Sequence, residues 1–255
     1  MLRTSGIHLG LIGKSLSHSF SKDYFEKRFE VESLQGCSYG LFEMPSLEGL
    51  RNQVETFSLD GFNVTIPYKV EILPLLDSID PVAAQVGAVN TVKVKRTYDG
   101  ALHLCGYNTD APAFLDTIRP LLAPHHRQAL ILGTGGASKA VAWALQQLGI
   151  GYLFVSRKPD GKPLTIGYDD PILRDRDHTL IVNATPVGMY PDCNASPWPY
   201  PNLLTPSHLC YDLVYNPSPT LFLKHALGKG AAVKDGLGML HRQADLAWQI
   251  WTNET

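Results

Sequence analysis

Apolar residues recur along the chain with two periods, one typical of strands and one typical of helices. In the first half of the chain, short apolar runs predict strands, and stretches whose apolar residues return every three or four positions predict helices. The predicted strands cover 6–12, 38–44, 61–67, 88–94 and 101–105, and the predicted helices cover 21–29, 45–57 and 68–78. The turn Asp99-Gly100 is expected to join the last two strands as a hairpin, and Pro74 to kink or break the third helix.

The same alternation restarts near residue 107. Strands are predicted at 128–132, 152–155, 179–183 and 208–213, and helices at 111–122, 138–148 and 235–251. Strands that alternate with helices favour mostly parallel sheets with helices on both faces. We therefore expect an α/β protein of two domains split near residue 107, whose last helix packs back across the boundary.

The composition excludes several classes of protein. The 255 residues are 44% hydrophobic, and 22 Lys and Arg nearly balance 24 Asp and Glu, for a net charge of −2. This balance is typical of a globular protein and offers no basic surface to nucleic acid. No apolar run reaches the ~18 residues of a transmembrane helix, and the stretch from Met1 to Phe20 lacks the apolar centre of a signal peptide. We expect a cytoplasmic protein with no nucleic-acid or membrane partner.

The four cysteines, Cys37, Cys105, Cys193 and Cys210, lie far apart in the sequence and form no CxxC pair. We expect them to be buried, reduced thiols and neither metal ligands nor disulfides. Because no His, Cys or Asp residues cluster at ligand spacing either, no metal is expected.

The glycine-rich segment 133–138 is the strongest local signal for a ligand. It follows the predicted strand 128–132 and opens a helix, where backbone N–H groups and the helix dipole favour a pyrophosphate. Gly133 is expected to make the tight turn and Gly135 to allow close approach, while Ser138 stands where a dinucleotide fingerprint has its third glycine. A plain tight turn is the alternative.

The end of the next strand indicates which nucleotide would bind. NAD-binding proteins place Asp or Glu there to hold the ribose hydroxyl, but this chain has Ser156, Arg157 and Lys158. The planar guanidinium of Arg157 suits a 2′-phosphate, and Lys158 adds a positive charge. The two cations favour NADP over NAD; two solvated surface residues are the alternative.

Small polar side chains gather beside predicted strand ends in the first half of the chain. The serine-rich stretch 13–21 precedes a helix, and its hydroxyls suit a carboxylate, although Ser19 or Ser21 can equally cap the helix. Asn90 lies in an apolar strand, where it must be hydrogen-bonded by protein or ligand. Asp110 sits at the mouth of the next helix, where capping is its ordinary role.

A second polar stretch contains Asn63, Thr65 and Lys69. Asn63 and Thr65 share one face of the predicted strand, and Lys69 falls in the first turn of the helix that follows. The positive end of that helix would disfavour the ammonium and so suit Lys69 to proton transfer. An exposed lysine without a chemical role is the alternative.

Together these stretches resemble the shikimate dehydrogenase family. The resemblance runs from His18 to Gln243, and its eight ordered motifs are far more specific together than singly. They are Ser-Phe-Ser at 19–21, Asn-Val-Thr-Ile-Pro-Tyr-Lys at 63–69, Gly-Ala-Val-Asn-Thr at 87–91, Asn-Thr-Asp at 108–110, Gly-Thr-Gly-Gly-Ala-Ser at 133–138, Asn-Ala-Thr at 183–185, Tyr-Asp-Leu-Val-Tyr at 211–215, and Asp-Gly-Leu-Gly-Met-Leu at 235–240 with Gln243.

The resemblance implies NADPH-dependent reduction of 3-dehydroshikimate to shikimate, in chorismate and aromatic amino-acid biosynthesis. It implies an N-terminal α/β substrate-binding catalytic domain at 1–107, with the terminal helix 239–255 packing back on it. A C-terminal Rossmann-type NADP-binding domain is expected at 108–238, with the substrate cleft between the two domains. The expected assembly is a monomer or a homodimer.

Carried over motif by motif, the resemblance assigns roles to individual residues. Lys69 and Asp110 would form the catalytic pair, in which Lys69 delivers a proton to the new alkoxide or polarises the oxygen. The substrate carboxylate and ring hydroxyls would be bound by Ser19, Ser21, Thr65, Asn90, Tyr215 and Gln243. The cofactor would be bound by Gly133, Thr134, Gly135, Gly136, Ala137, Ser138, Ser156, Arg157, Lys158, Leu213 and Gly236.

The chain departs from the family pattern at three places. Lys22 stands where the family often has proline, and Leu213 stands where several relatives have methionine. The segment 159–178 is too rich in Pro, Gly and Asp to form the helix that is usual there. This third departure bears on the 2′-phosphate side of the predicted cofactor site.

Other functions lead to different expectations. One alternative is a relative that acts on quinate or another hydroxy acid, and another is a catalytically silent nucleotide-binding sensor. The presence of both Lys69 and Asp110 counts against the sensor. A folate dehydrogenase of similar architecture would leave the motifs at 19–21 and 108–110 unexplained.

Overall fold

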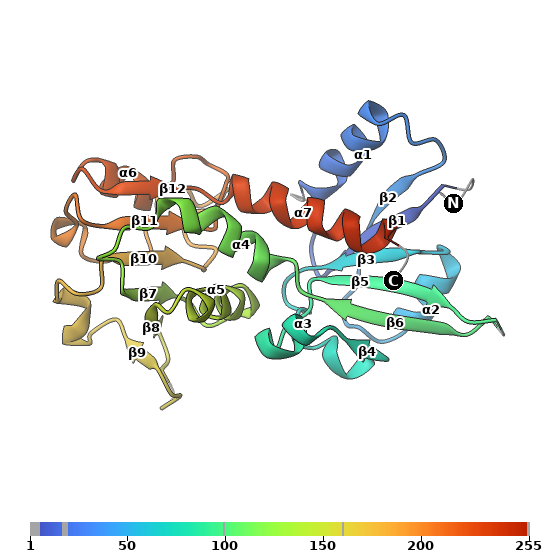
Figure 1. The fold of residues 1–255 in the computed structure, drawn as a ribbon, viewed down its shortest axis with the longest axis horizontal. Coiled ribbons are helices and arrows are strands. Elements are labelled where there is room, and N and C mark those ends of the chain that lie inside the picture. Colours follow the sequence, from blue (N-terminus) through green and yellow to red (C-terminus); the bar gives the residue numbers. More distant parts are fainter. Residues whose placement is uncertain (1–5, 17–19, 99, 160, 254–255) are drawn as a thin grey trace. The chain divides into compact units, whose positions relative to one another are not determined.

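The computed structural model describes residues 6–16, 20–98, 100–159 and 161–253. The chain divides into two compact units, one formed by Met1–Thr109 with Ala244–Thr255 and the other by Asp110–Gln243. Each unit is built on its own six-stranded sheet (Figure 1). The expected α/β fold, with a substrate-binding type of sheet followed by a Rossmann-type sheet, is confirmed.

The sheet of the first unit is mixed. Its strand order is β2-β1-β3-β5-β6-β4, in which β5 runs antiparallel to both of its neighbours and the other adjacent pairs are parallel. The elements are β1 (His8–Gly13), α1 (Ser21–Val31), β2 (Ser38–Glu43), α2 (Leu50–Thr56), β3 (Gly61–Val64), the short 3-10 helix η1 (Leu73–Leu75), β4 (Ser78–Ile79), α3 (Pro81–Val86), β5 (Thr91–Arg96) and β6 (Leu102–Tyr107). The predicted hairpin is confirmed by the antiparallel pair β5–β6, although Asp99 of its turn lies outside the described residues.

One predicted helix of this unit is shorter than expected, and another is wrong. The helix expected over 45–57 is confined to α2, because Gly49 just before it has a φ of 75°, a left-handed conformation that cannot continue a helix backwards. The segment 68–78 forms turns, η1 and β4 instead of a helix. Pro74 lacks an N–H for a longer helix, and the Asp77 carboxylate accepts from the N–H of Leu104 at 2.7 Å, which draws the chain onto the sheet edge.

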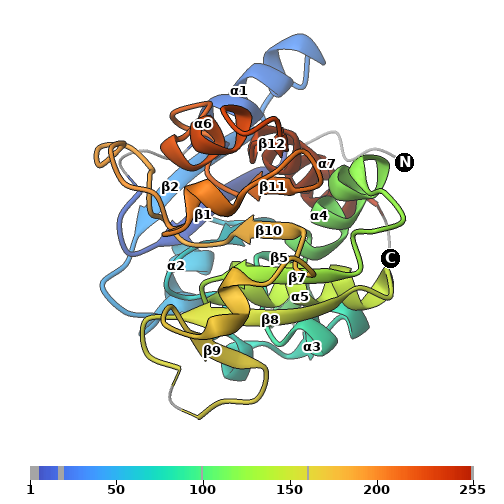
Figure 2. The ribbon, with the colours of Figure 1, turned by 90° about the vertical axis from the view of Figure 1, so that its left-hand side faces the viewer.

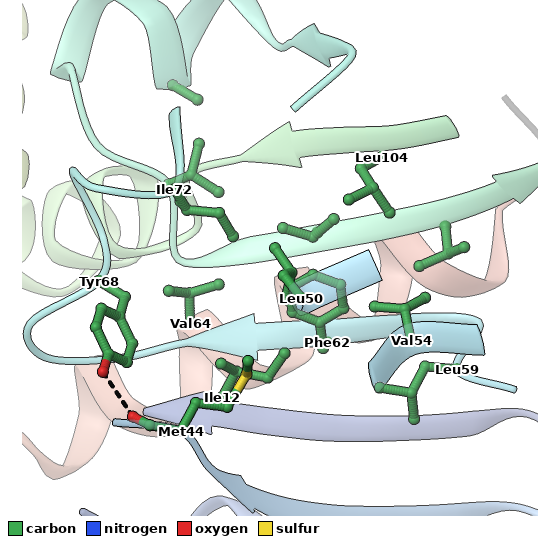
Figure 3. Packing of buried hydrophobic residues seen from close by; sticks show 14 residues of the cluster. Ile12, Met44, Leu50, Val54, Leu59, Phe62, Val64, Tyr68, Ile72 and Leu104 are labelled. Carbon is green, nitrogen blue, oxygen red and sulfur yellow. Dashed lines mark hydrogen bonds between the residues drawn. The ribbon is translucent and has the colours of Figure 1, made fainter. Parts of the chain in front are cut away.

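The main core of the first unit lies between the sheet and the short elements just described, α2 and the segment 68–78. Phe62, Val64 and Ile72 are fully or almost fully buried there, and Figure 3 shows the side chains packed together. The Tyr68 hydroxyl crosses the core edge and donates to the carbonyl oxygen of Met44 at 2.6 Å. The turn that follows β3 is therefore anchored by one buried aromatic side chain.

The end of the last helix, α7 (Leu237–Thr252), completes the first unit. The indole N–H of Trp251 donates to the carbonyl oxygen of Val92 in β5 at 2.9 Å. The ammonium of Lys93 donates to the carbonyl oxygens of Ile250, at 2.9 Å, and Asn253. The Lys93 ammonium thus satisfies carbonyls at the end of α7 that lack a partner within the helix.

All six strands of the second unit are parallel, in the order β12-β11-β10-β7-β8-β9 (Figure 2). The elements are α4 (Asp110–Ile118), η2 (Arg119–Leu121), β7 (Gln128–Leu132), α5 (Gly136–Gln147), β8 (Gly151–Ser156), β9 (Thr165–Gly167), η3 (Pro171–Arg174), β10 (Leu180–Asn183), η4 (Pro201–Leu203), β11 (Leu209–Asp212), α6 (Leu221–Leu227) and β12 (Ala232–Lys234), followed by α7. The four strands predicted here are confirmed within two residues. The short strands β9 and β12 carried too little apolar pattern to be predicted.

The segment 159–178 departs from the family pattern as expected. Its described residues form β9, η3 and turns rather than an α-helix. β9 extends the sheet beside β8, with Gly167 opposite Ser156. β9 is therefore the edge strand of this sheet.

The cysteines differ in burial from the prediction. All four are free thiols, but only Cys105 and Cys210 are buried, whereas Cys37 and Cys193 are half-buried. Burial raises the pKa of the Cys210 thiol to about 12. Among the described residues, no helix combines the length and the apolar character needed to cross a membrane.

Candidate functional site

The predicted substrate-binding stretches of the first unit come together at one end of the strands of its sheet. The parallel strands β1 and β3 end there, and β5, which runs the other way, begins there. Asn63 lies opposite Thr91 in the ladder, and the N–H of Val64 donates to the carbonyl oxygen of Asn90 at 2.9 Å. Strand pairing therefore brings the motifs around Asn63 and Asn90 together.

Lys69 lies at this end of the strands in a turn and not in a helix. Because residues 66–72 form turns, the expected helix N-terminus and the dipole argument built on it are wrong. The backbone carbonyl of Lys69 accepts from the N–H of Val89 at 2.7 Å, which ties the lysine to the segment that carries Asn90. The residues Thr65 and Lys69 are both half-buried.

Of the two predicted carboxylate-binding serines, Ser19 lies outside the described residues. Ser21 is the first residue of α1, and its hydroxyl hydrogen-bonds to Tyr39. The N-cap position belongs to Phe20, which makes no side-chain cap bond. Helix capping is therefore not the role of Ser21.

A buried hydrogen-bond network connects these stretches. The Tyr39 hydroxyl donates to Asn63 Oδ1 at 2.8 Å, and Asn63 Nδ2 donates to Thr91 Oγ1 at 3.1 Å and to the Asn90 carbonyl at 3.2 Å. Asn90 Oδ1 receives the Thr91 hydroxyl at 3.3 Å and the Thr109 N–H at 2.7 Å, while Asn90 Nδ2 donates to Thr109 Oγ1 at 2.9 Å. All five residues are buried.

Sequence reasoning missed Tyr39, Thr91 and Thr109 as members of this network. Thr91 and Thr109 stand inside the motifs at 87–91 and 108–110, so their position beside predicted ligands was the available signal. Tyr39 has no such signal, because it lies 24 residues before its partner Asn63.

Asp110 and Gln243 belong to the second unit, while Lys69 belongs to the first. Asp110 is buried and opens α4. Gln243 is buried in α7, and its amide donates to the Leu240 carbonyl at 2.9 Å. The pairing of Asp110 with Lys69 stays a prediction.

The glycine-rich segment forms the expected strand–turn–helix in the second unit. Gly133 follows β7 with a φ of 107°, and a Cβ there would lie 2.9 Å from Thr185 Cγ2. Gly135 precedes α5, and a Cβ there would meet no described atom within 4 Å. Gly133 is therefore required by the protein itself, whereas a need for glycine at position 135 would come from a ligand.

The remaining predicted cofactor residues surround the same turn and the end of β8. Thr134 is exposed, Gly136 and Ala137 are half-buried, and Ser138 is fully buried. The Ser156 hydroxyl donates to the Lys158 carbonyl at 2.9 Å and accepts from the Lys158 N–H at 3.1 Å. Ser156 therefore shapes the turn that carries the two cations, Arg157 and Lys158, which are both exposed.

Leu213 and Gly236 are brought into direct contact. A Cβ on Gly236 would lie 2.0 Å from the Leu213 carbonyl oxygen, so only glycine fits. The Gly236 N–H donates to the Val214 carbonyl at 3.2 Å. Tyr215, the predicted substrate ligand, is half-buried in the same loop after β11.

A buried carboxylate that the sequence did not reveal fixes this loop. Asp212 is fully buried and accepts from Asn183 Nδ2 at 2.8 Å, the Val214 N–H at 3.0 Å and Thr220 Oγ1 at 2.6 Å. Asn183 Oδ1 in turn accepts from the Thr185 hydroxyl at 2.6 Å. Because Thr185 packs on Gly133, Asp212 links the loop after β11 to the glycine turn.

Burial raises the pKa of Asp212 to about 6, although its three hydrogen-bond donors oppose the shift. Burial in an apolar environment disfavours the charged form of a carboxyl. The nearby Asp235 carboxylate adds to the rise, because a like charge disfavours the ionised form of Asp212.

Comparisons with known proteins support the resemblance to the shikimate dehydrogenase family. Residues 11–92 match the family model of the shikimate dehydrogenase substrate binding domain. The chain is 33% identical to the shikimate dehydrogenase (NADP(+)) of Caldanaerobacter subterraneus subsp. tengcongensis, over 96% of this chain and 91% of that protein.

Two solved structures extend the comparison to the whole fold. Shikimate 5-dehydrogenase of Thermus thermophilus, in complex with NADP(H) and shikimate, matches with a TM-score of 0.83 at 35% identity, covering 96% of this chain and 93% of that one. Quinate dehydrogenase from Corynebacterium glutamicum, in complex with NAD, matches with a TM-score of 0.83 at 29% identity, covering 97% and 94%.

The parallel sheet and its glycine turn define a dinucleotide-binding type of α/β protein. The identity to the relatives extends over both units. The chain belongs to the shikimate dehydrogenase family.

We predict that Gly236→Ala destabilises the second unit, because the new methyl group collides with the backbone at Leu213. Overpacking of this kind costs about 1–3 kcal/mol of unfolding free energy, measurable by urea denaturation. Gly238→Ala is the matched control, since its Cβ would meet the flexible end of Lys234 at 3.4 Å and Thr117 Cγ2 at 3.8 Å, both without a clash. Equal stability of the two variants would contradict the prediction.

We predict a pH-dependent difference in stability between the wild type and Asp212→Asn. Between pH 3.8 and about 6, folded Asp212 keeps its proton while the unfolded carboxyl has lost it. The wild type therefore loses unfolding free energy relative to the variant as pH rises, by up to about 1 kcal/mol per pH unit. Urea denaturation across this range measures the difference; a flat or rising difference would show that Asp212 ionises normally.

Proposed function

We propose that the chain is an NADP-dependent shikimate dehydrogenase that reversibly reduces 3-dehydroshikimate to shikimate in chorismate and aromatic amino-acid biosynthesis. The observation that carries this function is the 33% identity to a curated NADP(+) enzyme over 96% of the chain. A relative solved with NADP(H) and shikimate together supports both ligands.

The second unit fits NADP. The space beside Gly135 and the N-terminus of α5 suit a pyrophosphate, and the exposed cations Arg157 and Lys158 suit the 2′-phosphate. Leu213 follows β11 and Gly236 follows β12, and the two residues are in contact. The surface that they form together suits the nicotinamide. When bound, the cofactor supplies or accepts the hydride.

In the first unit, Ser21, together with Ser19, would hold the substrate carboxylate. Thr65 and Asn90 would hold ring hydroxyls, because Thr65 follows the end of β3 and Asn90 precedes the start of β5, and these two points are paired in the sheet. Tyr215 and Gln243 of the second unit would complete the substrate site. Polar groups placed in this way orient the substrate carbonyl for reduction.

Lys69 would move the proton of the reaction. In the reducing direction its ammonium Nζ donates a hydrogen bond to the carbonyl oxygen and then transfers a proton to the alkoxide that forms. Asp110 would orient the ammonium and accept a hydrogen bond from a neighbouring hydroxyl. Hydrogen bonds of the backbone hold both residues in place. The Val89 N–H donates to the Lys69 carbonyl, and the N–H of Thr109, the residue before Asp110, donates to Asn90 Oδ1.

We expect this enzyme to act in the cytoplasm as a monomer or a homodimer. Four free thiols suit a reducing compartment. Light scattering of the purified protein measures its assembly.

The proposed function predicts NADPH formation when the protein is given shikimate and NADP, followed by the absorbance of the reduced nicotinamide. The same assay with quinate and with NAD tests the specificity. We expect kcat/KM to be about tenfold or more in favour of shikimate and of NADP, whose phosphate contacts are charge-assisted.

Each other result of this assay has a distinct meaning. A preference for quinate would indicate the activity named for the Corynebacterium glutamicum relative. Absence of turnover with every pair would favour a silent nucleotide-binding sensor and refute the proposed function.

We predict that Lys69→Ala lowers kcat by about a hundredfold or more, because general acid–base groups contribute on that scale. The KM for shikimate should change by less than about threefold, since other residues hold the substrate. Lys27→Ala, at an exposed position of α1, is the control and should keep wild-type turnover. Near-wild-type kcat in the Lys69 variant would remove the lysine from the mechanism.

A further inference from the structure

Thr91 occupies the centre of the buried network beneath the predicted substrate residues. It is the first residue of β5, it is fully buried, and its hydroxyl lies within hydrogen-bond distance of the side chains of Asn63, Asn90 and Thr109. We propose that Thr91 is a positioning residue for the substrate site, which fixes the orientation of the Asn90 amide without touching the substrate. The inference rests on the proposed function, because it takes Asn90 as a ligand of the substrate ring.

The orientation of Asn63 is determined first. The backbone carbonyl of Asn90 can only accept a hydrogen bond, so the side-chain nitrogen of Asn63 must face it, at 3.2 Å. The oxygen of that amide then faces Tyr39, whose hydroxyl donates to it at 2.8 Å. Burial raises the pKa of the Tyr39 hydroxyl well above its ordinary value, so this donor keeps its proton.

The direction of the next bonds follows. Asn63 Nδ2 donates to Thr91 Oγ1 at 3.1 Å, and the Thr91 hydroxyl donates to Asn90 Oδ1 at 3.3 Å. Thr91 Oγ1 also lies 3.2 Å from Thr109 Oγ1, a contact in which either hydroxyl can be the donor. The N–H of Thr109, which can only donate, reaches Asn90 Oδ1 at 2.7 Å. Two donors therefore hold Asn90 Oδ1, and the Asn90 nitrogen faces Thr109 Oγ1 at 2.9 Å.

The orientation of the Asn90 amide matters because a flipped amide exchanges the positions of its donor and its acceptor. A ring hydroxyl bound at Asn90 would then meet the wrong group, and the site would lose both a hydrogen bond and its selectivity for that hydroxyl. Hydrogen bonds in a chain polarise one another, so the loss of one link weakens the next. The hydroxyl of Thr91 is the link between the amides of Asn63 and Asn90.

The experiment compares two substitutions at this one position. Thr91→Val keeps the shape of the side chain and removes the hydroxyl, whereas Thr91→Ser keeps the hydroxyl and removes a methyl group. We expect Thr91→Val to raise the KM for shikimate about tenfold, as the loss of one neutral hydrogen bond implies. The KM for NADP should stay unchanged, and Thr91→Ser should remain within about twofold of the wild type.

A double-mutant cycle with Asn90→Ala separates positioning from a general loss of structure. If Thr91 acts through Asn90, Thr91→Val adds no further rise in the KM for shikimate once the Asn90 amide is gone. Multiplied effects in the double variant would show that Thr91 acts elsewhere, and the inference would be wrong. Thr179→Val, another buried threonine but in the second unit, is the control for stability and should leave the KM for shikimate unchanged.

Two further outcomes keep the test decisive. If Thr91→Val does not fold, Thr91→Cys replaces the hydroxyl by a weaker donor and acceptor, and its KM for shikimate should lie clearly above that of Thr91→Ser. A KM equal to that of Thr91→Ser overturns the inference. Failure of the wild type to oxidise shikimate would instead overturn the proposed function, whereas an active wild type with unchanged KM in Thr91→Val removes this inference alone.

Discussion

Polar side chains buried at the ends of the two sheets must find every hydrogen-bond partner within the protein, and both candidate sites are built on that requirement. Asn63 in the first sheet uses its oxygen and its nitrogen on three different partners. Asp212 in the second sheet receives three donors. A buried polar group that loses its partner costs about 1–3 kcal/mol, so the loops that supply these partners are held in one conformation.

Asn63 and Asp212, the buried polar residues at the two sites, differ in charge. They therefore respond differently to pH. Asn63 is neutral, and the backbone carbonyl of Asn90, which can only accept, decides which way its amide faces. Asp212 ionises against the penalty of burial, which raises its pKa to about 6. The geometry of the substrate site therefore depends on hydrogen-bond direction, whereas the loop near Leu213 also depends on proton concentration.

Elements that depend on local pattern were predictable from the sequence, and elements decided by distant contacts were not. The strand β7 and the hairpin β5–β6 follow from apolar runs and a glycine turn. The segment 68–78 carries a helical pattern, but Pro74 and the bond from the Leu104 N–H to Asp77 override it. At the site, the resemblance supplied Leu213 and Gly236, which do meet. Asp212 was not predicted, because its partners Asn183 and Thr220 are brought near only by folding. Thr91 stands beside Asn90 in the sequence, but its contacts with Asn63 and Thr109 also depend on folding.

The way α7 fastens onto β5 has a consequence for how the chain matures. The first sheet is made of early residues, yet Trp251 and Lys93 show that its last covering layer comes from the end of the chain. During synthesis the second unit can assemble from a continuous stretch, Asp110–Gln243, as it leaves the ribosome. The first unit, by contrast, includes Ala244, Ala247 and Trp251 in its own core, so that core cannot be completed until these residues have been synthesised.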